Sequence, residues 1–146
     1  MKKSLVMILS VFAMFASNAG AAQDVFSCVI KKNGKQVTLS HDADRVSYIY
    51  GPPGKTPELT LAMPVAKTQL EVWEGFGRVR AYSIGLPKGG YLYVVNTWSD
   101  SLDGSSGRGV RVEKGDNVLS ELECDPATVR GDLEAYVIRQ HELIHP

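Results

Sequence analysis

Hydrophobic and polar residues alternate along most of this chain after residue 24. Alternation with a period of two is typical of a β-strand that has one buried and one exposed face. Turn-forming residues separate the alternating runs, as expected for short strands joined by turns. The runs lie at 25–31, 37–39, 45–50, 59–63, 70–72, 73–86, 91–98, 109–113 and 118–124. They predict a mainly β protein, an antiparallel β-barrel or sandwich of about eight strands with one C-terminal α-helix.

One turn sets the expected register of the first hairpin. Asn33-Gly34 is the strongest two-residue signal for a type I′ turn, in which both central residues need a positive φ. Pairing outward from this turn places Ile30 opposite Val37. Two positions further along, Cys28 lies opposite Leu39. These four side chains then share one face, which we predict to be the core face.

A second hairpin is expected around residues 115–117, Gly-Asp-Asn. A three-residue loop there pairs Val110 with Leu122. It also pairs Arg111 with Glu121, and opposite charges directly across two strands stabilise the pairing.

The middle of the chain holds two less regular features. The run 73–86 is interrupted by Gly75 and Gly77, which predicts a bulge or the corner of a barrel within one long strand. The run 91–98 is apolar on both faces and rich in strand-forming residues, so it is expected to be a central strand.

The C-terminal segment carries the signals of a helix at about residues 126–143. Asp125 is the expected N-cap and Pro126 the first helical residue. Gly131 weakens the start of this helix by roughly 1 kcal/mol relative to alanine. The apolar positions fall within about 80° of arc, which indicates one packing face. Its predicted members are Val129, Leu133, Tyr136, Val137, Gln140 and Ile144.

The first residues have the three-part layout of a secretory signal peptide. Met1-Lys2-Lys3 precede an apolar run at 5–15 and small residues at 16–22. We expect cleavage after Ala22 or Ala21, so that residues 1–22 are the signal peptide and residues 23–146 form a single β-rich domain. The apolar run is shorter than the roughly 20 residues that cross a bilayer, and no membrane span is predicted.

The charge of the chain limits the classes of partner it can bind, and its two cysteines indicate the compartment. Without Lys2 and Lys3 the chain keeps 14 basic and 16 acidic residues, so no charge excess attracts nucleic acid or an anionic membrane. Export leads to the oxidising periplasm, where Cys28 and Cys124 are expected to form a disulfide. Closing so long a loop stabilises the fold by about 4–5 kcal/mol in the chain-entropy model.

The sharpest motif is the sequence HELIH at residues 141–145, which matches the H-E-x-x-H pattern of zinc hydrolases. In that pattern two histidines bind Zn²⁺ and the glutamate is the general base. Helical geometry places His141 and His145 beside the packing face and Glu142 toward water, whereas catalysis needs all three in one cleft. We therefore expect a solvated helix end without metal or cofactor, and a metal-dependent hydrolase is an alternative.

The candidate binding surface combines one strand and the loop that follows another. Arg78, Arg80 and Tyr82 alternate away from Val79 and Ala81, and a long polar loop follows residue 98. Mixed aromatic, arginine and loop positions are typical of protein interfaces and glycan-binding faces. The predicted binding residues are Arg78, Arg80, Tyr82, Trp98, Asp100, Asp103, Ser106 and Arg108.

Several segments, together with the signal peptide, resemble a family of small exported proteins of Gram-negative bacteria that has no assigned activity. They are VFSCVIKKNGKQVTL, YIYGPPGKTPELTL, GFGRVRAYSI, YLYVV and GVRVEKGDNVLSELEC, and they cover most of the mature chain up to Cys124. This resemblance implies a periplasmic β-protein.

More distantly, the layout is similar to the periplasmic and membrane-bound inhibitors of C-type lysozyme, which are small disulfide-linked β-barrels. A Ser-Gly-x-x-Tyr motif of that family enters the lysozyme active site. Ser106-Gly107 matches the start of the motif, and Val110 stands where the tyrosine is expected.

These observations favour a non-enzymatic periplasmic binding or inhibitor module that acts through the loop 99–108 and the strand of Arg78, Arg80 and Tyr82. We expect its partner to be another protein or a cell-wall component. Besides the metal-dependent hydrolase, a structural or envelope-stress protein without a small ligand is a second alternative.

Overall fold

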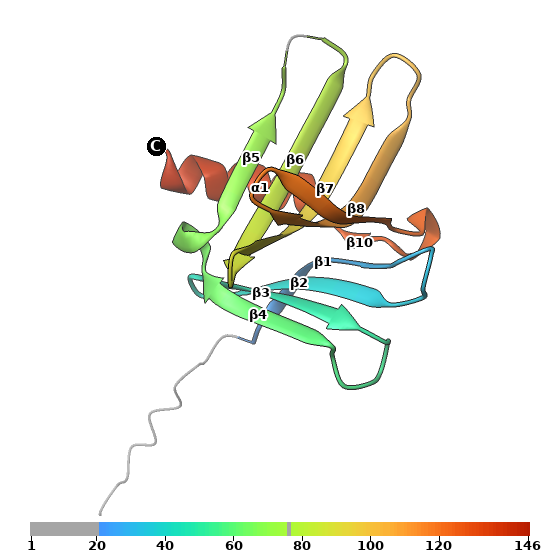
Figure 1. Cartoon of the computed structure of the whole chain (residues 1–146). Helices are drawn as coiled ribbons and strands as arrows, with labels where there is room; N and C mark the ends of the chain where they lie inside the picture. Colours follow the sequence, from blue (N-terminus) through green and yellow to red (C-terminus); the bar gives the residue numbers. More distant parts are fainter. Residues whose placement is uncertain (1–20, 76) are drawn as a thin grey trace, which may run out of the picture.

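In the part of the chain that the structure describes, the fold consists of two antiparallel sheets of five strands each and one C-terminal helix (Figure 1). The computed structural model describes residues 21–75 and 77–146, so the predicted signal peptide lies, up to residue 20, outside the described residues. The first sheet has the strand order β10-β1-β2-β3-β4. Its strands are β1 (Gln23–Val29), β2 (Gln36–Asp42), β3 (Arg45–Gly51), β4 (Leu59–Pro64) and β10 (Arg130–Gly131).

The second sheet follows the chain order β5-β6-β7-β8-β9. Its strands are β5 (Gln69–Trp73), β6 (Val79–Lys88), β7 (Tyr91–Asp100), β8 (Ser106–Lys114) and β9 (Asn117–Glu123). A short 3₁₀ helix, η1 (Val65–Lys67), leads from the first sheet to the second. A second one, η2 (Pro126–Thr128), leads back from β9 toward β10.

The predicted mainly β architecture is confirmed, and of its two forms the structure is the sandwich, because the two sheets do not close into a barrel. They meet at one corner, where the end of β9 reaches β1. Cys124 forms an isolated antiparallel bridge with Ile30, and the Lys31 amide donates to the Glu123 carbonyl at 3.0 Å. The predicted disulfide joins Cys28 and Cys124 at the same corner, with the two Cα atoms 5.7 Å apart.

One hydrophobic core lies between the sheets and under the helix. The core face predicted for the first hairpin is confirmed, because Cys28, Ile30, Val37 and Leu39 are all buried. Side chains from the second sheet and the helix complete the cluster. Its members from those elements are Tyr82, Ile84, Leu86, Val95, Val110, Leu133, Tyr136 and Val137.

The predicted register of the first hairpin is wrong by two residues. Cys28 pairs with Val37, not with Leu39. Of the two expected turn residues only Gly34 has a positive φ, 68°, and Ile30 bonds to both Gly34 and Lys35. Ile30 and Lys35 therefore close a four-residue loop, residues 31–34, which ends in a glycine with a positive φ. The faces are unaffected because a shift of two preserves the alternation.

The second hairpin has the predicted pairing of Val110 with Leu122 and of Arg111 with Glu121. The turn itself is tighter than expected, because Lys114 pairs directly with Asn117. A register shift after residue 112 takes up the extra residue, as a β-bulge does. The predicted pairing is therefore confirmed, although the predicted loop is one residue longer than the observed loop.

The run 73–86 is not one long strand. β5 ends at Trp73, β6 begins at Val79, and the two strands pair antiparallel with Val72 opposite Tyr82. Gly75 and Gly77 therefore lie in the connection of a hairpin, so neither marks a bulge or a barrel corner. The expected central strand at 91–98 is confirmed as β7, which lies between β6 and β8.

The helix begins later than predicted. Asp125 does cap a helical turn, with its side chain accepting from the Ala127 amide, but this turn is the 3₁₀ helix η2. Gly131 has φ +82° and pairs with Phe26 of β1, which interrupts the helical conformation. The α-helix proper, α1 (Leu133–Ile144), starts after a second cap at Asp132.

The packing face predicted for the helix is largely correct. Leu133, Tyr136, Val137 and Gln140 are buried, whereas Ile144 is exposed. The helix packs against β5 and β6. The Tyr136 hydroxyl also lies 2.9 Å from Nδ1 of His41 on β2, so the helix is tied to both sheets.

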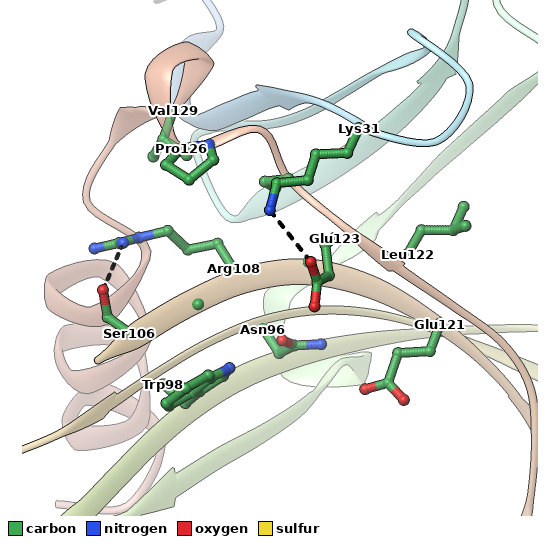
Figure 2. A pocket seen from close by; sticks show the side chains of 13 residues that line it. Lys31, Asn96, Trp98, Ser106, Arg108, Glu121, Leu122, Glu123, Pro126 and Val129 are labelled. Carbon is green, nitrogen blue, oxygen red and sulfur yellow. Dashed lines mark hydrogen bonds and ion pairs between the residues drawn. The ribbon is translucent and has the colours of Figure 1, made fainter. Parts of the chain in front are cut away.

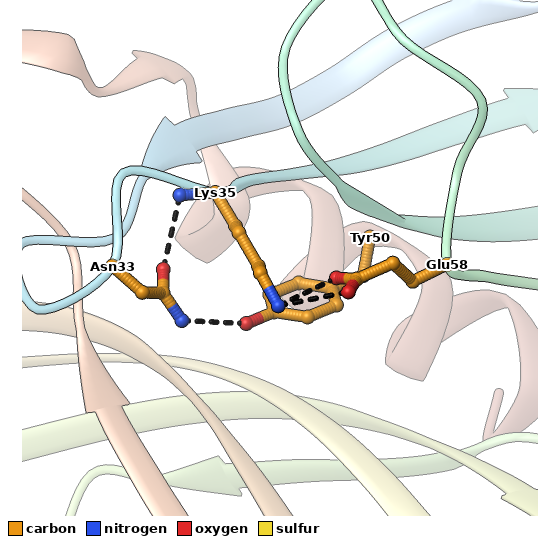
Figure 3. Close-up of polar contacts among 4 residues, drawn as sticks. All are labelled: Asn33, Lys35, Tyr50 and Glu58. Carbon is orange, nitrogen blue, oxygen red and sulfur yellow. Dashed lines mark hydrogen bonds and ion pairs between the residues drawn. The ribbon is translucent and has the colours of Figure 1, made fainter.

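A polar cluster lies at the end of the first sheet that is opposite to His41 (Figure 3). Lys35 pairs with Glu58 at 2.8 Å and lies over the ring of Tyr50. Asn33 donates from its amide to the Tyr50 hydroxyl at 2.9 Å. The hydrogen bond that Lys35 donates to the Glu58 carboxylate raises the pKa of Lys35. This cluster joins the β1–β2 turn to the start of β4.

Candidate functional site

The β5–β6 and β7–β8 hairpins extend beyond the rest of the second sheet (Figure 1). Among the described residues near the ends of these hairpins, four large apolar ones are exposed to solvent. They are Trp73, Val79, Trp98 and Leu102. Exposed apolar groups that gather in one region are a feature of binding surfaces, whereas single ones are common anywhere.

The end of the β7–β8 hairpin is a short ordered loop, residues 101–105, which we call the tip loop. The Leu102 amide donates to Oδ1 of Asp100 at 2.9 Å, and the Ser105 amide donates to Oδ1 of Asp103 at 2.8 Å. Gly104 has φ +72° and donates its amide to the Asp100 carbonyl at 3.0 Å. Hydrogen bonds from Ser105 lower the pKa of Asp103. Two aspartate turns and one glycine therefore define the shape of the loop.

Contacts between Arg78, which directly precedes β6, and residues Asp100 and Ser101 hold the tip loop to the neighbouring hairpin. We call this set of contacts the latch. Nε of Arg78 lies 2.8 Å from Oδ2 of Asp100, whose side chain is only 7% exposed. The Ser101 amide and hydroxyl both donate to the Arg78 carbonyl, at 2.9 and 3.1 Å. Two of the predicted binding residues, Arg78 and Asp100, are thus paired with each other, and the buried one shapes the loop.

Tyr82 does not belong to the exposed surface that was predicted for it. Its ring is buried in the core, and its hydroxyl donates to Glu74 at 3.0 Å. Burial, with that hydrogen bond, raises the pKa of Tyr82 to about 12. The alternation was assigned to the wrong face, since the side of β6 that carries Tyr82 and Ile84 packs inward. Arg80, nearer the hairpin end, is exposed.

A pocket of about 290 Å³ opens between the second sheet and the segment that follows β9. We call it the Trp98 pocket (Figure 2). Figure 2 shows Lys31 and Pro126 on one side of it and Trp98 and Asn96 on the other. Three predicted binding residues meet here. They are Trp98, Ser106 and Arg108.

Charges of both signs surround the Trp98 pocket. Lys31 and Glu123 form an ion pair at 3.4 Å, and both side chains are largely exposed. Arg108 donates to the Ser106 hydroxyl at 3.4 Å, and Glu121 lines the wall beside Asn96. Two cationic and two anionic side chains therefore balance one another at this site.

Sequence reasoning missed four polar residues of the pocket. They are Lys31, Asn96, Glu121 and Glu123. Lys31 follows β1, and Glu121 and Glu123 belong to β9, so only the folded topology brings these three residues to the pocket. Two signals did exist in the sequence. Asn96 lies two residues before Trp98, on the same face of one strand, and the positions opposite these two residues on β8 are Gly109 and Gly107, which have no side chains.

The HELIH motif lies at the end of α1. Glu142 and His145 are exposed and His141 is half-buried, so Glu142 faces water as helical geometry predicts. In residues 21–75 and 77–146, no three His, Cys, Asp or Glu side chains are grouped as metal ligands. None of the helices in that part of the chain has the length and apolar character of a membrane span.

Comparison of the chain with protein-family models, curated proteins and solved structures finds no match. The candidate site therefore rests on the geometry of this chain. It has two parts, the tip loop with its latch and the Trp98 pocket beside it.

Proposed function

We propose that this chain is an exported, non-enzymatic binding module of the inhibitor type, which acts on another protein through the tip loop. The observation that carries the proposal is the presentation of Leu102, whose side chain is 73% exposed at the end of an ordered hairpin. A leucine exposed to this degree contributes little to folding, and Leu102 is not part of the described core. It is suited to entering an apolar pocket on a partner.

The rigidity of the tip loop supports this proposal. Association costs free energy whenever a loop or side chain is ordered at the interface, and a loop that is already ordered avoids that cost. Here the hydrogen bonds of Asp100 and Asp103 and the contacts of Arg78 hold the loop before any partner arrives. Inhibitors that bind with little change of backbone use loops of this kind.

The surroundings of the loop have the composition of an interface. Arg80 lies on β6 beside it, Arg78 directly precedes that strand, and Val79 is exposed between them. Arginine and aromatic residues are enriched at protein interfaces, and Trp98 at the end of β7 adds an aromatic group. The Ser106-Gly107 pair, where the chain resembles the lysozyme inhibitors, opens β8 directly after the loop.

The disulfide supports the proposed compartment. Disulfides persist in oxidising compartments and are rare in the bacterial cytosol. The bond between Cys28 and Cys124 is consistent with export to the periplasm, where the signal peptide would direct the chain.

The proposal is tested by binding to defined partners, with a matched pair of variants. Purified chain is titrated against lysozymes of the C, G and invertebrate types, and against proteins of a periplasmic extract by cross-linking. Leu102→Asp is compared with Leu119→Asp, because Leu119 is also exposed, at 56%, but lies on β9. We expect Leu102→Asp to weaken binding at least tenfold and Leu119→Asp to leave it unchanged.

Two results would count against the proposal. One is a partner whose affinity is the same for wild-type chain and Leu102→Asp. The other is the absence of any saturable protein partner across the whole panel, which would favour the structural or envelope-stress alternative.

A further inference from the structure

The wall of the Trp98 pocket combines an aromatic ring with strand backbone. The indole of Trp98 is 39% exposed and lies against Gly107, where a Cβ atom would come within 2.5 Å of the indole Nε1. Glycine at this position therefore lets the ring rest on β8. A ring held in this way offers a fixed apolar surface at the mouth of the pocket.

Hydrogen-bonding groups of different kinds surround that ring. The Asn96 amide supplies both donors and an acceptor, Glu121 and Glu123 accept, and Arg108 and Lys31 donate. These side chains come from β7, β8, β9 and the turn after β1. Groups that converge from four elements fix the orientation of a ligand far better than groups on one loop.

The balance of charge limits the class of ligand. Lys31 already pairs with Glu123 at 3.4 Å, and Glu121 offsets Arg108. A phosphate or carboxylate ligand needs an excess of cationic donors, which this pocket lacks. A lipid or other purely apolar ligand would leave these charged groups without water, at a high cost in free energy.

The size of the pocket sets the size of the ligand. Its volume of about 290 Å³ lies at the small end of the range for ligand pockets, which is ~300–1,000 Å³. One or two six-membered rings fit this volume. A sugar ring also matches the chemistry, because its C–H face is apolar and its edge carries hydroxyl groups that both donate and accept.

We propose that the Trp98 pocket binds a neutral saccharide of one or two rings, which stacks on Trp98 and hydrogen-bonds to Asn96 and Glu121. This site is additional to the protein-binding surface of the tip loop and does not depend on it. Leu102 belongs to the tip loop, whereas Asn96 and Glu121 belong to the pocket. The two activities are therefore separable by mutation.

The chain offers a direct reporter for this site, because it has only two tryptophans. In a Trp73→Phe background the fluorescence comes from Trp98 alone. Four sugars are titrated: glucose, maltose, N-acetylglucosamine and its β-1,4-linked disaccharide, with glucose 6-phosphate as the charged comparison. Calorimetry gives each affinity for the unaltered chain and for Trp98→Leu, which lacks the fluorescent reporter.

Three variants test the assignment. Asn96→Leu keeps the branched shape and the number of heavy atoms of the side chain and removes its hydrogen bonds, and Trp98→Leu removes the ring. Trp73→Leu is the matched control, because Trp73 is 60% exposed in the same sheet but does not line the pocket. We expect millimolar or tighter binding of at least one neutral sugar, at least tenfold weaker in Asn96→Leu and Trp98→Leu and unchanged in Trp73→Leu.

Other outcomes overturn the proposal. They are no saturable binding of any neutral sugar, tighter binding of glucose 6-phosphate than of glucose, or binding that Asn96→Leu leaves intact. If Trp98→Leu does not fold, Asn96→Leu alone decides. Leu102→Asp separates the two proposals, since it should weaken binding to a protein partner at least tenfold while sugar binding is unchanged.

Discussion

Breaking the disulfide is expected to remove a large part of the stability of this chain. Cys28 and Cys124 are 96 residues apart in sequence, and a loop of that length corresponds to about 4.7 kcal/mol in the chain-entropy model. The bridge between Ile30 and Cys124 and the neighbouring backbone bonds remain in the reduced protein. These contacts stabilise only the folded state, so they do not reduce the conformational entropy that the unfolded chain gains when the disulfide is broken.

The measurement compares urea unfolding of the oxidised chain, the reduced chain and the double variant Cys28→Ala/Cys124→Ala. We expect the free energy of unfolding to fall by about 4–5 kcal/mol on reduction, against the 5–15 kcal/mol that is typical of a whole domain. The m-value should rise, because the open unfolded chain exposes more surface. A loss below about 1 kcal/mol with the same m-value would refute this account of the bond.

Three further outcomes are expected. Gly131→Ala should lower the free energy of unfolding by about 2–4 kcal/mol, as measured by thermal unfolding, because Gly131 has a positive φ and its added Cβ would clash with a β1 carbonyl. Gly115→Ala, also at a positive φ but in open space, should lower it by about 1 kcal/mol. Equal losses in the two variants would show that the clash does not matter. Arg78→Ala should destabilise the chain by about 1–2 kcal/mol and speed amide exchange in the tip loop, while Arg80→Ala does neither. Unchanged exchange in Arg78→Ala would show that the contacts of Arg78 do not hold the loop. Burial raises the pKa of Tyr48 above its ordinary value of 10.0, so the stability it contributes is complete below pH 10 and is lost as the pH rises through the folded pKa. Tyr48→Phe should therefore unfold at a higher pH than the wild type, as followed by circular dichroism, and an unchanged alkaline midpoint would argue against this contribution.

Local pattern was enough to predict the strands and their buried faces. A period of two is readable from neighbouring residues alone, and Cys28 and Leu39 are buried as the alternation requires. The register of the first hairpin was not readable in the same way. Asn33-Gly34 fits both a two-residue turn and a four-residue loop that ends in Gly34, and only the pairing of the strands decides between them.

The helix start shows why a correct local signal gave a wrong boundary. Asp125 and Pro126 do begin a helical turn, but Gly131 is drawn into a two-residue pairing with β1. That pairing joins residues more than a hundred positions apart in the sequence, so no local pattern reports it. The helix starts only after Asp132 supplies a second cap.

The candidate site was predicted in part for a related reason. Trp98, Ser106 and Arg108 lie near one another in sequence, and the structure places all three at one pocket. Glu121 belongs to β9 and Lys31 follows β1, so they reach the pocket only when the chain folds. Asn96 was missed although alternation places it on the same face of β7 as Trp98. Tyr82 was misplaced because alternation separates two faces of a strand without saying which of them is buried.

The tip loop also has a consequence for how new specificity can arise. The shape of this loop depends on Asp100, Asp103, Gly104 and the latch of Arg78. Leu102 does not belong to the hydrophobic core of the described residues. Surface positions of this kind usually change stability by about 0.5 kcal/mol or less when substituted. A lineage or a designed library can therefore exchange the side chain at position 102 to select a different target while the sandwich beneath it stays the same.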